Sequence, residues 1–201
     1  DQANLLVQKL EDNENQDRAK VLNLVIPLSF YLSFDPHGCR VMQSAMRNAP
    51  SQKALLIFAQ FQGSIFRGAC DAYCNYVLQE VVCTLQPTHL VVMYKELSSG
   101  LYFLSRHFYA CRIIQRIIEH GAQSKFCEQF MTNLLKFCLA LSRHENGRFV
   151  IEKLTEFGSN KHLKCIVKAM LIDLWKSILC RNTRTVLYGI LQQPGRSRGK
   201  L

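Results

Sequence analysis

The sequence has no apolar run long enough to cross a bilayer. Its longest apolar stretch, residues 21–34, is interrupted by Asn23, Pro27 and two serines, whereas a membrane-spanning helix needs about 20 consecutive, mostly apolar residues. The amino-terminal residues also lack the pattern of a secretory signal peptide. We therefore expect no membrane partner.

Acidic residues are scarce: the 201 residues include 15 Asp and Glu against 25 Lys and Arg, which gives a formal net charge of +10. A basic excess of this size indicates an anionic partner, for which nucleic acid and an anionic membrane surface are the usual candidates. The sequence contains no GxSxG, HExxH, Walker or dinucleotide-binding glycine motif. We therefore predict a binding protein without a cofactor or metal rather than an enzyme.

Strict alternation of apolar and polar residues, the pattern of a half-buried strand, is also missing, and apolar residues recur at helical spacing instead. The pentapeptide CRVMQ at residues 39–43 is nearly repeated as CRIIQ at residues 111–115, and NYVLQ at residues 75–79 has the same pattern. Aligned on the fifth residue, six copies follow one another at spacings of 35, 36, 36, 37 and 36 residues, ending at Gln8, Gln43, Gln79, Gln115, Glu152 and Tyr188. This period predicts an α-helical solenoid, in which each repeat buries its apolar face against its neighbours.

The turn residues repeat as well. Pro50 and Pro87 are 37 residues apart and suit the first turn of a helix, while Gly121 and Gly158, also 37 apart, suit the position just past a helix end. Each repeat is thus predicted to contain one helix, a short break and a second helix that carries the pentapeptide.

The nine cysteines form neither a disulfide nor a metal pattern. Their number is odd and they stand singly in apolar stretches, which favours reduced thiols that pack as small apolar groups. Cys70 and Cys74 have a spacing that zinc could use, but no second Cys or His pair follows at a suitable distance. Cys111 and His107 could pair as nucleophile and base, but no third group is present to orient them. Because His107 and His144 both follow Ser-Arg four residues before a pentapeptide, we expect a repeated structural role for them.

Helix geometry divides the pentapeptide into two faces. At about 100° per residue, positions one, two and five lie at about 0°, 100° and 40°, whereas positions three and four lie at about 200° and 300°. Positions three and four are apolar in every copy after the first and are predicted to form the core: Val41/Met42, Val77/Leu78, Ile113/Ile114, Val150/Ile151 and Val186/Leu187. Positions one, two and five, called the triplet below, are predicted to be displayed together, with neighbouring triplets about 8–10 Å apart.

The triplets combine flat groups with side-chain amides. In chain order they are Asn4/Leu5/Gln8, Cys39/Arg40/Gln43, Asn75/Tyr76/Gln79, Cys111/Arg112/Gln115, Arg148/Phe149/Glu152 and Arg184/Thr185/Tyr188. Aromatic rings and guanidinium groups at position two are surfaces on which unstacked bases lie, and the amides match the donors and acceptors of a base edge. On a chain of charge +10, this pattern predicts a surface for single-stranded nucleic acid.

Three segments resemble the helix-two signature of the Pumilio (PUF) repeat: DPHGCRVMQ at residues 35–43, CNYVLQ at 74–79 and ACRIIQ at 110–115. The resemblance extends over about residues 1–191, while residues 192–201 are expected to be a basic, disordered tail. It implies an all-α, right-handed solenoid of about six repeats, shaped as a crescent, whose concave face binds single-stranded RNA with one base per repeat.

The family's base code, carried over triplet by triplet, implies a preference for 5′-(G)AUAU-3′, because RNA runs antiparallel to the protein in this family. The implied base-edge contacts are Asn4 and Gln8 for U, Cys39 and Gln43 for A, Asn75 and Gln79 for U, Cys111 and Gln115 for A, and Glu152, with Arg148 at position one, for G where the carboxylate is free. The implied stacking residues are Arg40, Tyr76, Arg112 and Phe149.

The chain departs from the family pattern in several places. Arg148 stands four residues before Glu152, where the two can pair along a helix. The last triplet corresponds to no base, and the U-G-U element that begins the family's usual site is not encoded in full. The first repeat starts within its second helix, so we expect either further sequence upstream or a partner that covers this end.

Two functions remain open. The resemblance implies a cytoplasmic post-transcriptional regulator that binds the 3′ untranslated regions of messenger RNA and recruits protein corepressors, through its convex face or carboxy-terminal end, for translational repression or decay. The alternative is a diverged PUF-like scaffold that binds RNA or protein without base specificity, for example during ribosome assembly in the nucleus or nucleolus.

Overall fold

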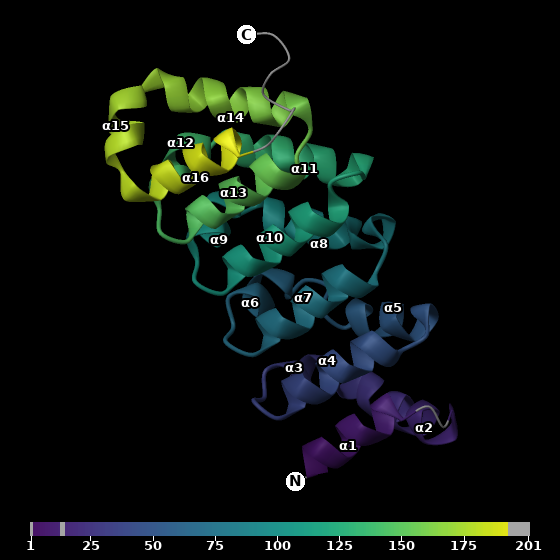
Figure 1. Cartoon of the computed structure of the whole chain (residues 1–201). Coiled ribbons are helices and arrows are strands. Elements are labelled where there is room, and N and C mark those ends of the chain that lie inside the picture. Colours follow the sequence, from purple (N-terminus) through teal and green to yellow (C-terminus); the bar gives the residue numbers. More distant parts are fainter. Residues whose placement is uncertain (1, 13–14, 193–201) are drawn as a thin grey trace. The chain divides into compact units, whose positions relative to one another are not determined.

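The structure, a computed structural model, describes residues 2–12 and 15–192. These residues are helical almost throughout and include no β-strand (Figure 1), which confirms the all-α prediction for this part of the chain. None of the helices within it combines the length and the apolar character needed to span a membrane. The chain divides into two compact units, Asp1–Glu96 and Leu97–Leu201. From residue 193 onward, the predicted basic tail lies outside the described residues.

In the first unit, three helices carry pentapeptides: α1 (Gln2–Glu11), α4 (Gly38–Asn48) and α7 (Cys74–Thr84). Helix α4 packs against both α1 and α7, so the three lie side by side (Figure 1). The elements between and after them are α2 (Asn15–Val25), the 3-10 helix η1 (Ile26–Leu28), α3 (Ser29–Ser33), α5 (Ser51–Ala59), α6 (Ile65–Ala69), the 3-10 helix η2 (Pro87–Leu90) and α8 (Val91–Ser98).

The second unit has the same organisation. Its pentapeptides lie on α10 (Ala110–Gly121), α13 (Gly147–Phe157) and α16 (Arg181–Leu191), and α13 packs against both of the others (Figure 1). The remaining helices are α9 (Leu101–Arg106), α11 (Lys125–Leu135), α12 (Cys138–Arg143), α14 (Asn160–Ile172) and α15 (Leu174–Leu179).

Each predicted break between two helices is itself a short helix of five or six residues, namely α3, α6, α9, α12 or α15. A repeat therefore contains three helices, one more than the two that the turn residues predicted. That the chain amounts to six repeats stays a prediction.

Positions three and four of the pentapeptides form the core, as predicted. Both are buried in α4, α7, α10 and α13, with at most 2% of any of these eight side chains exposed. Burial of one such side chain stabilises the fold by about 1.5–3 kcal/mol. In α16, Val186 is buried and Leu187 is half-buried.

In α4, α7, α10 and α13, a side chain four residues before the pentapeptide caps the helix that carries it. The Oδ1 atom of Asp35 accepts the backbone N–H groups of residues 37 and 38 at 2.9 and 2.7 Å, and the Oδ1 atom of Asp71 accepts those of residues 73 and 74. In the second unit, the Nδ1 atoms of His107 and His144 accept the equivalent pairs at 3.2 and 3.3 Å. The cap satisfies amides that the first turn leaves without an intrahelical partner. The structural role predicted for the two histidines is therefore confirmed.

Cys180 occupies the next capping position. The nearby backbone of Thr183, and to a smaller extent of Asn182, lowers the pKa of its thiol. Its side chain makes no capping hydrogen bond to α16, but its position continues the series Asp35, Asp71, His107 and His144 at spacings of 36, 36, 37 and 36 residues, the period of the pentapeptides.

The first residue is small in α4, α7, α10 and α13, and in α4 and α13 it must be, because the preceding short helix lies against it. A Cβ atom on Gly38 would lie 2.4 Å from the carbonyl oxygen of Leu32, and one on Gly147 would lie 2.8 Å from that of Leu141. Cys74 fills the same place in α7 and is fully buried, and burial raises the pKa of its thiol far above the usual range. This environment fits packing rather than metal binding, and the described residues contain no cluster of three His, Cys, Asp or Glu side chains that could hold a metal ion.

Candidate nucleic-acid interface

The side chains at position two are exposed, as predicted for a displayed position. In the first unit these are Arg40 on α4 and Tyr76 on α7, whose side chain is 46% exposed. In the second unit they are Arg112 on α10 and Phe149 on α13, the latter 38% exposed. The guanidinium of Arg112 lies 5.9 Å from the ring centroid of Phe108, an exposed aromatic residue that the sequence analysis did not single out.

The glutamines at position five of the second, third and fourth triplets are half-buried and held by their own helices. Gln43 and Gln115 donate from Nε2 to the backbone carbonyls of Cys39 and Cys111, at 3.2 and 3.1 Å. Gln79 differs, because its Nε2 donates to the side-chain oxygen of Asn75 at 3.0 Å. Within residues 2–12 and 15–192, no donor is bonded to the Oε1 atoms of these three glutamines.

The side chains at position one of the second, third and fourth triplets are recessed, in contrast to the even display that helix geometry alone predicted. Cys39 and Cys111 are 4% and 3% exposed, and Asn75 is fully buried. The cause is the turn before each helix, which folds over the first turn: the thiols of Cys39 and Cys111 donate to carbonyls three residues earlier, at 3.4 and 3.5 Å. Asn75 donates to the carbonyls of Asp71 and Ala72 at 2.8 and 2.9 Å.

Burial raises the pKa of the thiols of Cys39 and Cys111, so both remain neutral near pH 7. A neutral thiol is a small, soft surface against which a base can pack, and it is a poor nucleophile. His107 is also engaged as a helix cap through its Nδ1 atom. The structure therefore does not assemble a nucleophile and base from Cys111 and His107.

The first triplet lies on α1 and is open. Asn4, Leu5 and Gln8 are all exposed. A cavity of about 180 Å³ opens beside the second triplet, between α1 and α4, and is lined by Val7, Glu11, Arg40, Gln43, Ser44 and Arg47. Position two and position five of the second triplet therefore border one small hollow.

The side chains of the fifth triplet contact one another and also contact the sixth triplet. Arg148 donates from Nη1 to Oε1 of Glu152 at 2.9 Å, and its guanidinium lies 3.8 Å from the ring centroid of Phe149. Thr185, from the sixth triplet, is hydrogen-bonded to both Arg148 and Glu152. The sequence indicated the Arg148–Glu152 pair through its four-residue spacing, but it gave no sign that Thr185 would join them.

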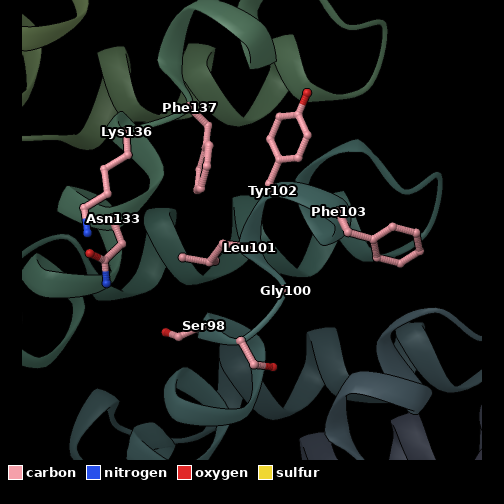
Figure 2. Close-up of a pocket in the computed structure, with 9 residues that line it drawn as sticks. Ser98, Gly100, Leu101, Tyr102, Phe103, Asn133, Lys136 and Phe137 are labelled. Carbon is pink, nitrogen blue, oxygen red and sulfur yellow. The ribbon is translucent and has the colours of Figure 1, made fainter.

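A second hollow, of about 430 Å³, has no triplet residue in its lining (Figure 2). Figure 2 shows Leu101 and Phe137 converging on it, with Asn133 and Lys136 together on one side. The ring centroids of Tyr102 and Phe137 are 5.1 Å apart. Its lining contains no carboxylate, histidine or cysteine, so the groups that usually perform acid–base or nucleophilic chemistry are not gathered there.

Comparisons with known proteins point to one family. The profile of the Pumilio-family RNA binding repeat matches residues 30–60, 102–131 and 137–171. The chain is 27% identical to pumilio homolog 8 of Arabidopsis thaliana over 149 residues, which is 73% of this chain and 29% of the homologue. It is 23% identical to Fem-3 mRNA-binding factor 2 of Caenorhabditis elegans over 185 residues, which is 81% of this chain and 29% of that protein. The chain thus spans less than a third of the length of these relatives.

Solved structures of PUF proteins have the same fold as this chain. The structure of PUF-8 in complex with PBE-RNA matches with a TM-score of 0.89 at 22% identity, over 95% of this chain and 56% of that one. The Puf3 RNA binding domain bound to a Cox17 RNA 3′ UTR site matches with a TM-score of 0.85 at 21% identity, over 96% of this chain and 56% of that one. The helical repeats, the pentapeptide signature and these matches agree: the chain belongs to the Pumilio (PUF) family.

Proposed function

We propose that this chain binds single-stranded RNA through its triplets, with one base facing each triplet that recognises a base. The observation that carries the proposal is the recurrence, in both units, of an exposed flat side chain at position two beside a glutamine amide at position five. A flat side chain provides a stacking surface worth about 1–3 kcal/mol per base, and the amide provides donors and acceptors for the base edge. The PUF-8 and Puf3 structures, which contain RNA, support the proposal.

The proposed core of the site is 5′-AUAU-3′. The second and fourth triplets share one geometry, in which glutamine donates to the carbonyl of a recessed cysteine, and we assign adenine to both. In the third triplet, glutamine donates to an asparagine side chain instead, which supports a different base, and we assign uracil. The first triplet, Asn4 with Gln8, is assigned the uracil at the 3′ end.

We propose further that this binding serves post-transcriptional regulation of messenger RNA in the cytoplasm, with protein corepressors as additional partners. The name of Fem-3 mRNA-binding factor 2, one of the relatives, supports the choice of messenger RNA. The alternative is a scaffold with little base preference. It is favoured by the sixth triplet, Arg184/Thr185/Tyr188, which offers no amide to a base.

A binding series separates the two. The affinity of the chain is measured by fluorescence anisotropy for a short RNA that contains GAUAU, for a scrambled RNA of the same composition and for the matching DNA, each at several salt concentrations. Sequence-specific reading predicts that the scrambled RNA binds at least about tenfold more weakly, since one mismatched base typically costs about 1–3 kcal/mol in duplex readout. Equal binding of the two RNAs, lost together as salt rises, would identify a non-specific electrostatic surface and support the scaffold.

A further inference from the structure

We propose that the contacts among Arg148, Glu152 and Thr185 prevent the fifth triplet from recognising a base. This three-residue cluster is called the stop below. On this view, the base on the 5′ side of AUAU is accepted without preference, although Glu152 stands where a guanine-reading carboxylate would stand. The inference rests on the proposed function, because it concerns where the RNA site ends.

The carboxylate of Glu152 is already bonded at the atom that guanine would need. Guanine presents two adjacent donors, N1–H and the N2 amine, and a carboxylate matches them with both of its oxygens at once. In the structure, Oε1 of Glu152 accepts from Arg148 and also lies within hydrogen-bond distance of the Thr185 hydroxyl. A guanine could pair fully only after these contacts are broken.

A base would not easily displace the contacts among Arg148, Glu152 and Thr185. The ion pair is charge-assisted, and the side chains of Arg148 and Glu152 are 23% and 28% exposed, so it is shielded from water more than a surface pair is. Arg148 also donates to Thr185 Oγ1 at 3.2 Å, which closes a ring of three side chains. Thr185 comes from α16, whereas Arg148 and Glu152 come from α13, so the ring ties two neighbouring helices together.

The aromatic ring of Phe149, the flat group of the fifth triplet, is also in contact with Arg148. The guanidinium of Arg148 lies 3.8 Å from the ring centroid of Phe149, which is close stacking of a cation on an aromatic face. A base that approached this face of Phe149 would have to displace Arg148. Both parts of the fifth triplet, the edge reader and the flat group, therefore have partners within the protein.

Comparison with the fourth triplet explains why an arginine at position one has this effect. Position one of the fourth triplet is Cys111, which is small and recessed, and Gln115 is left with an unbonded Oε1 among the described residues. Arg148 has a long side chain at the same position, so it reaches the residue one turn later on its own helix. Arg148 is thus a positioning residue that withholds Glu152 from the RNA.

The test measures base preference at the position 5′ to AUAU, using four RNAs that differ only there. The wild-type chain is expected to bind all four within about twofold, while still preferring AUAU over a scrambled core. The variant Arg148→Ser removes the guanidinium and is expected to prefer guanine over the other three bases by about tenfold, which corresponds to the cost of one mismatched base. The double variant Arg148→Ser/Glu152→Gln is expected to lose that preference.

Two controls separate charge and folding from base reading. Lys164→Ser removes one positive charge from an exposed site on α14 and is expected to weaken binding of all four RNAs equally. A double-mutant cycle on Arg148 and Glu152 without RNA, measured by urea unfolding, is expected to show that their effects on the unfolding constant depart from multiplicative behaviour by about twofold or more. Such coupling would show that the pair forms in the free chain.

The outcomes are distinct. A tenfold guanine preference in the wild-type chain, or none in Arg148→Ser while the AUAU core is still preferred, would overturn the stop. Independent effects in the double-mutant cycle would also overturn it, because the pair would then not hold Glu152. Loss of the AUAU preference itself in the wild-type chain would overturn the proposed function, and the stop with it.

Discussion

The two units of the chain cap equivalent helices with different chemistry. In the first unit, carboxylates of Asp35 and Asp71 accept the first-turn amides of α4 and α7, whereas in the second unit imidazoles of His107 and His144 accept those of α10 and α13. The geometry is the same, since in each case one acceptor atom bonds the amides two and three residues later. What differs is the protonation state in which the acceptor works, because a carboxylate accepts when ionised and Nδ1 of histidine accepts only when it carries no proton. One fold can therefore have equivalent parts with different responses to pH.

The largest effect should be common to both units. Gly38→Val and Gly147→Val each place a branched side chain against a backbone carbonyl, 2.4 and 2.8 Å from the new Cβ atom, and each is expected to lower the free energy of unfolding by about 3 kcal/mol. Urea denaturation followed by circular dichroism measures the loss.

Gly189→Ala is the control for these glycine variants. Its new Cβ would meet only the Thr155 hydroxyl, at 3.8 Å. Because alanine favours a helix more than glycine does, this variant is expected to raise the free energy of unfolding by about 1 kcal/mol. A glycine variant in one unit that is tolerated while its counterpart is not would show that the two units pack these helices differently.

A second pair of variants compares the units in RNA binding. Cys39→Asn and Cys111→Asn change position one of two triplets with the same glutamine geometry, and each is expected to move the preference at one base from A toward U, by about 1–3 kcal/mol. Competition binding with RNAs that differ at one base measures the shift. An unchanged preference at either site would mean that the cysteine there does not face a base.

Removing one cap from each unit should have an intermediate effect. Asp71→Ala and His107→Ala each leave two first-turn amides without their acceptor, and each is expected to cost about 1 kcal/mol of unfolding free energy at pH 7.5. Similar losses in urea denaturation would show that carboxylate and neutral imidazole cap equally well. A loss in only one unit would break the equivalence of the two caps.

The smallest effect, and the one that distinguishes the units, is the response to mild acid. Burial, and next the nearby Arg106, lower the pKa of His144 below 6.5, with Glu145 acting in the opposite direction. The folded state therefore binds this proton less readily than the unfolded state does. The stabilisation from the His144 cap is complete above about pH 6.5 and is lost as the pH falls through the lowered pKa.

The Asp35 cap in the first unit should not respond in this range. Backbone hydrogen bonds from Gly38, and next from His37, lower the pKa of Asp35 below 3.8, so its contribution is present above pH 3.8 and is lost only below it. Hydrogen exchange of the first-turn amides at pH 7.5 and 5.5, corrected for intrinsic rates, should show a loss of protection at residues 146–147 but not at residues 37–38.

Exchanging the two caps would test this assignment. His144→Asp is expected to remove the response from α13, and Asp35→His is expected to create it in α4. Equal protection of both helices at both pH values in the wild-type chain would refute the difference between the units.

Local patterns in the sequence predicted the helices and their buried faces well. The apolar pairs of α4, α7, α10 and α13 are buried as expected, because at about 100° per residue positions three and four lie on the side of the helix away from position five. The repeated Ser-Arg-His segment also predicted a structural role, which the caps of α10 and α13 confirm. In both cases the interaction lies within a few residues along the chain.

Predictions were less complete where distant residues meet. The angle of position one around its helix suggested display, yet Cys39, Asn75 and Cys111 are recessed because the preceding turn covers them. The break within each repeat is a short helix whose close approach requires Gly38 and Gly147. Neither the turn's path nor that contact can be read from helical periodicity.

The sequence by itself determined the repeat, the helices, the buried pairs and the order of amides and flat groups that supports AUAU, because each of these depends on spacing within one helix or on a period along the chain. Only the tertiary structure decided which triplets are available. Thr185 reaches Glu152 across 33 residues of sequence, and this contact exists only because α16 packs against α13. The residue types of a triplet depend only on the sequence of its own helix. Whether its side chains face solvent or one another depends on the neighbouring helix.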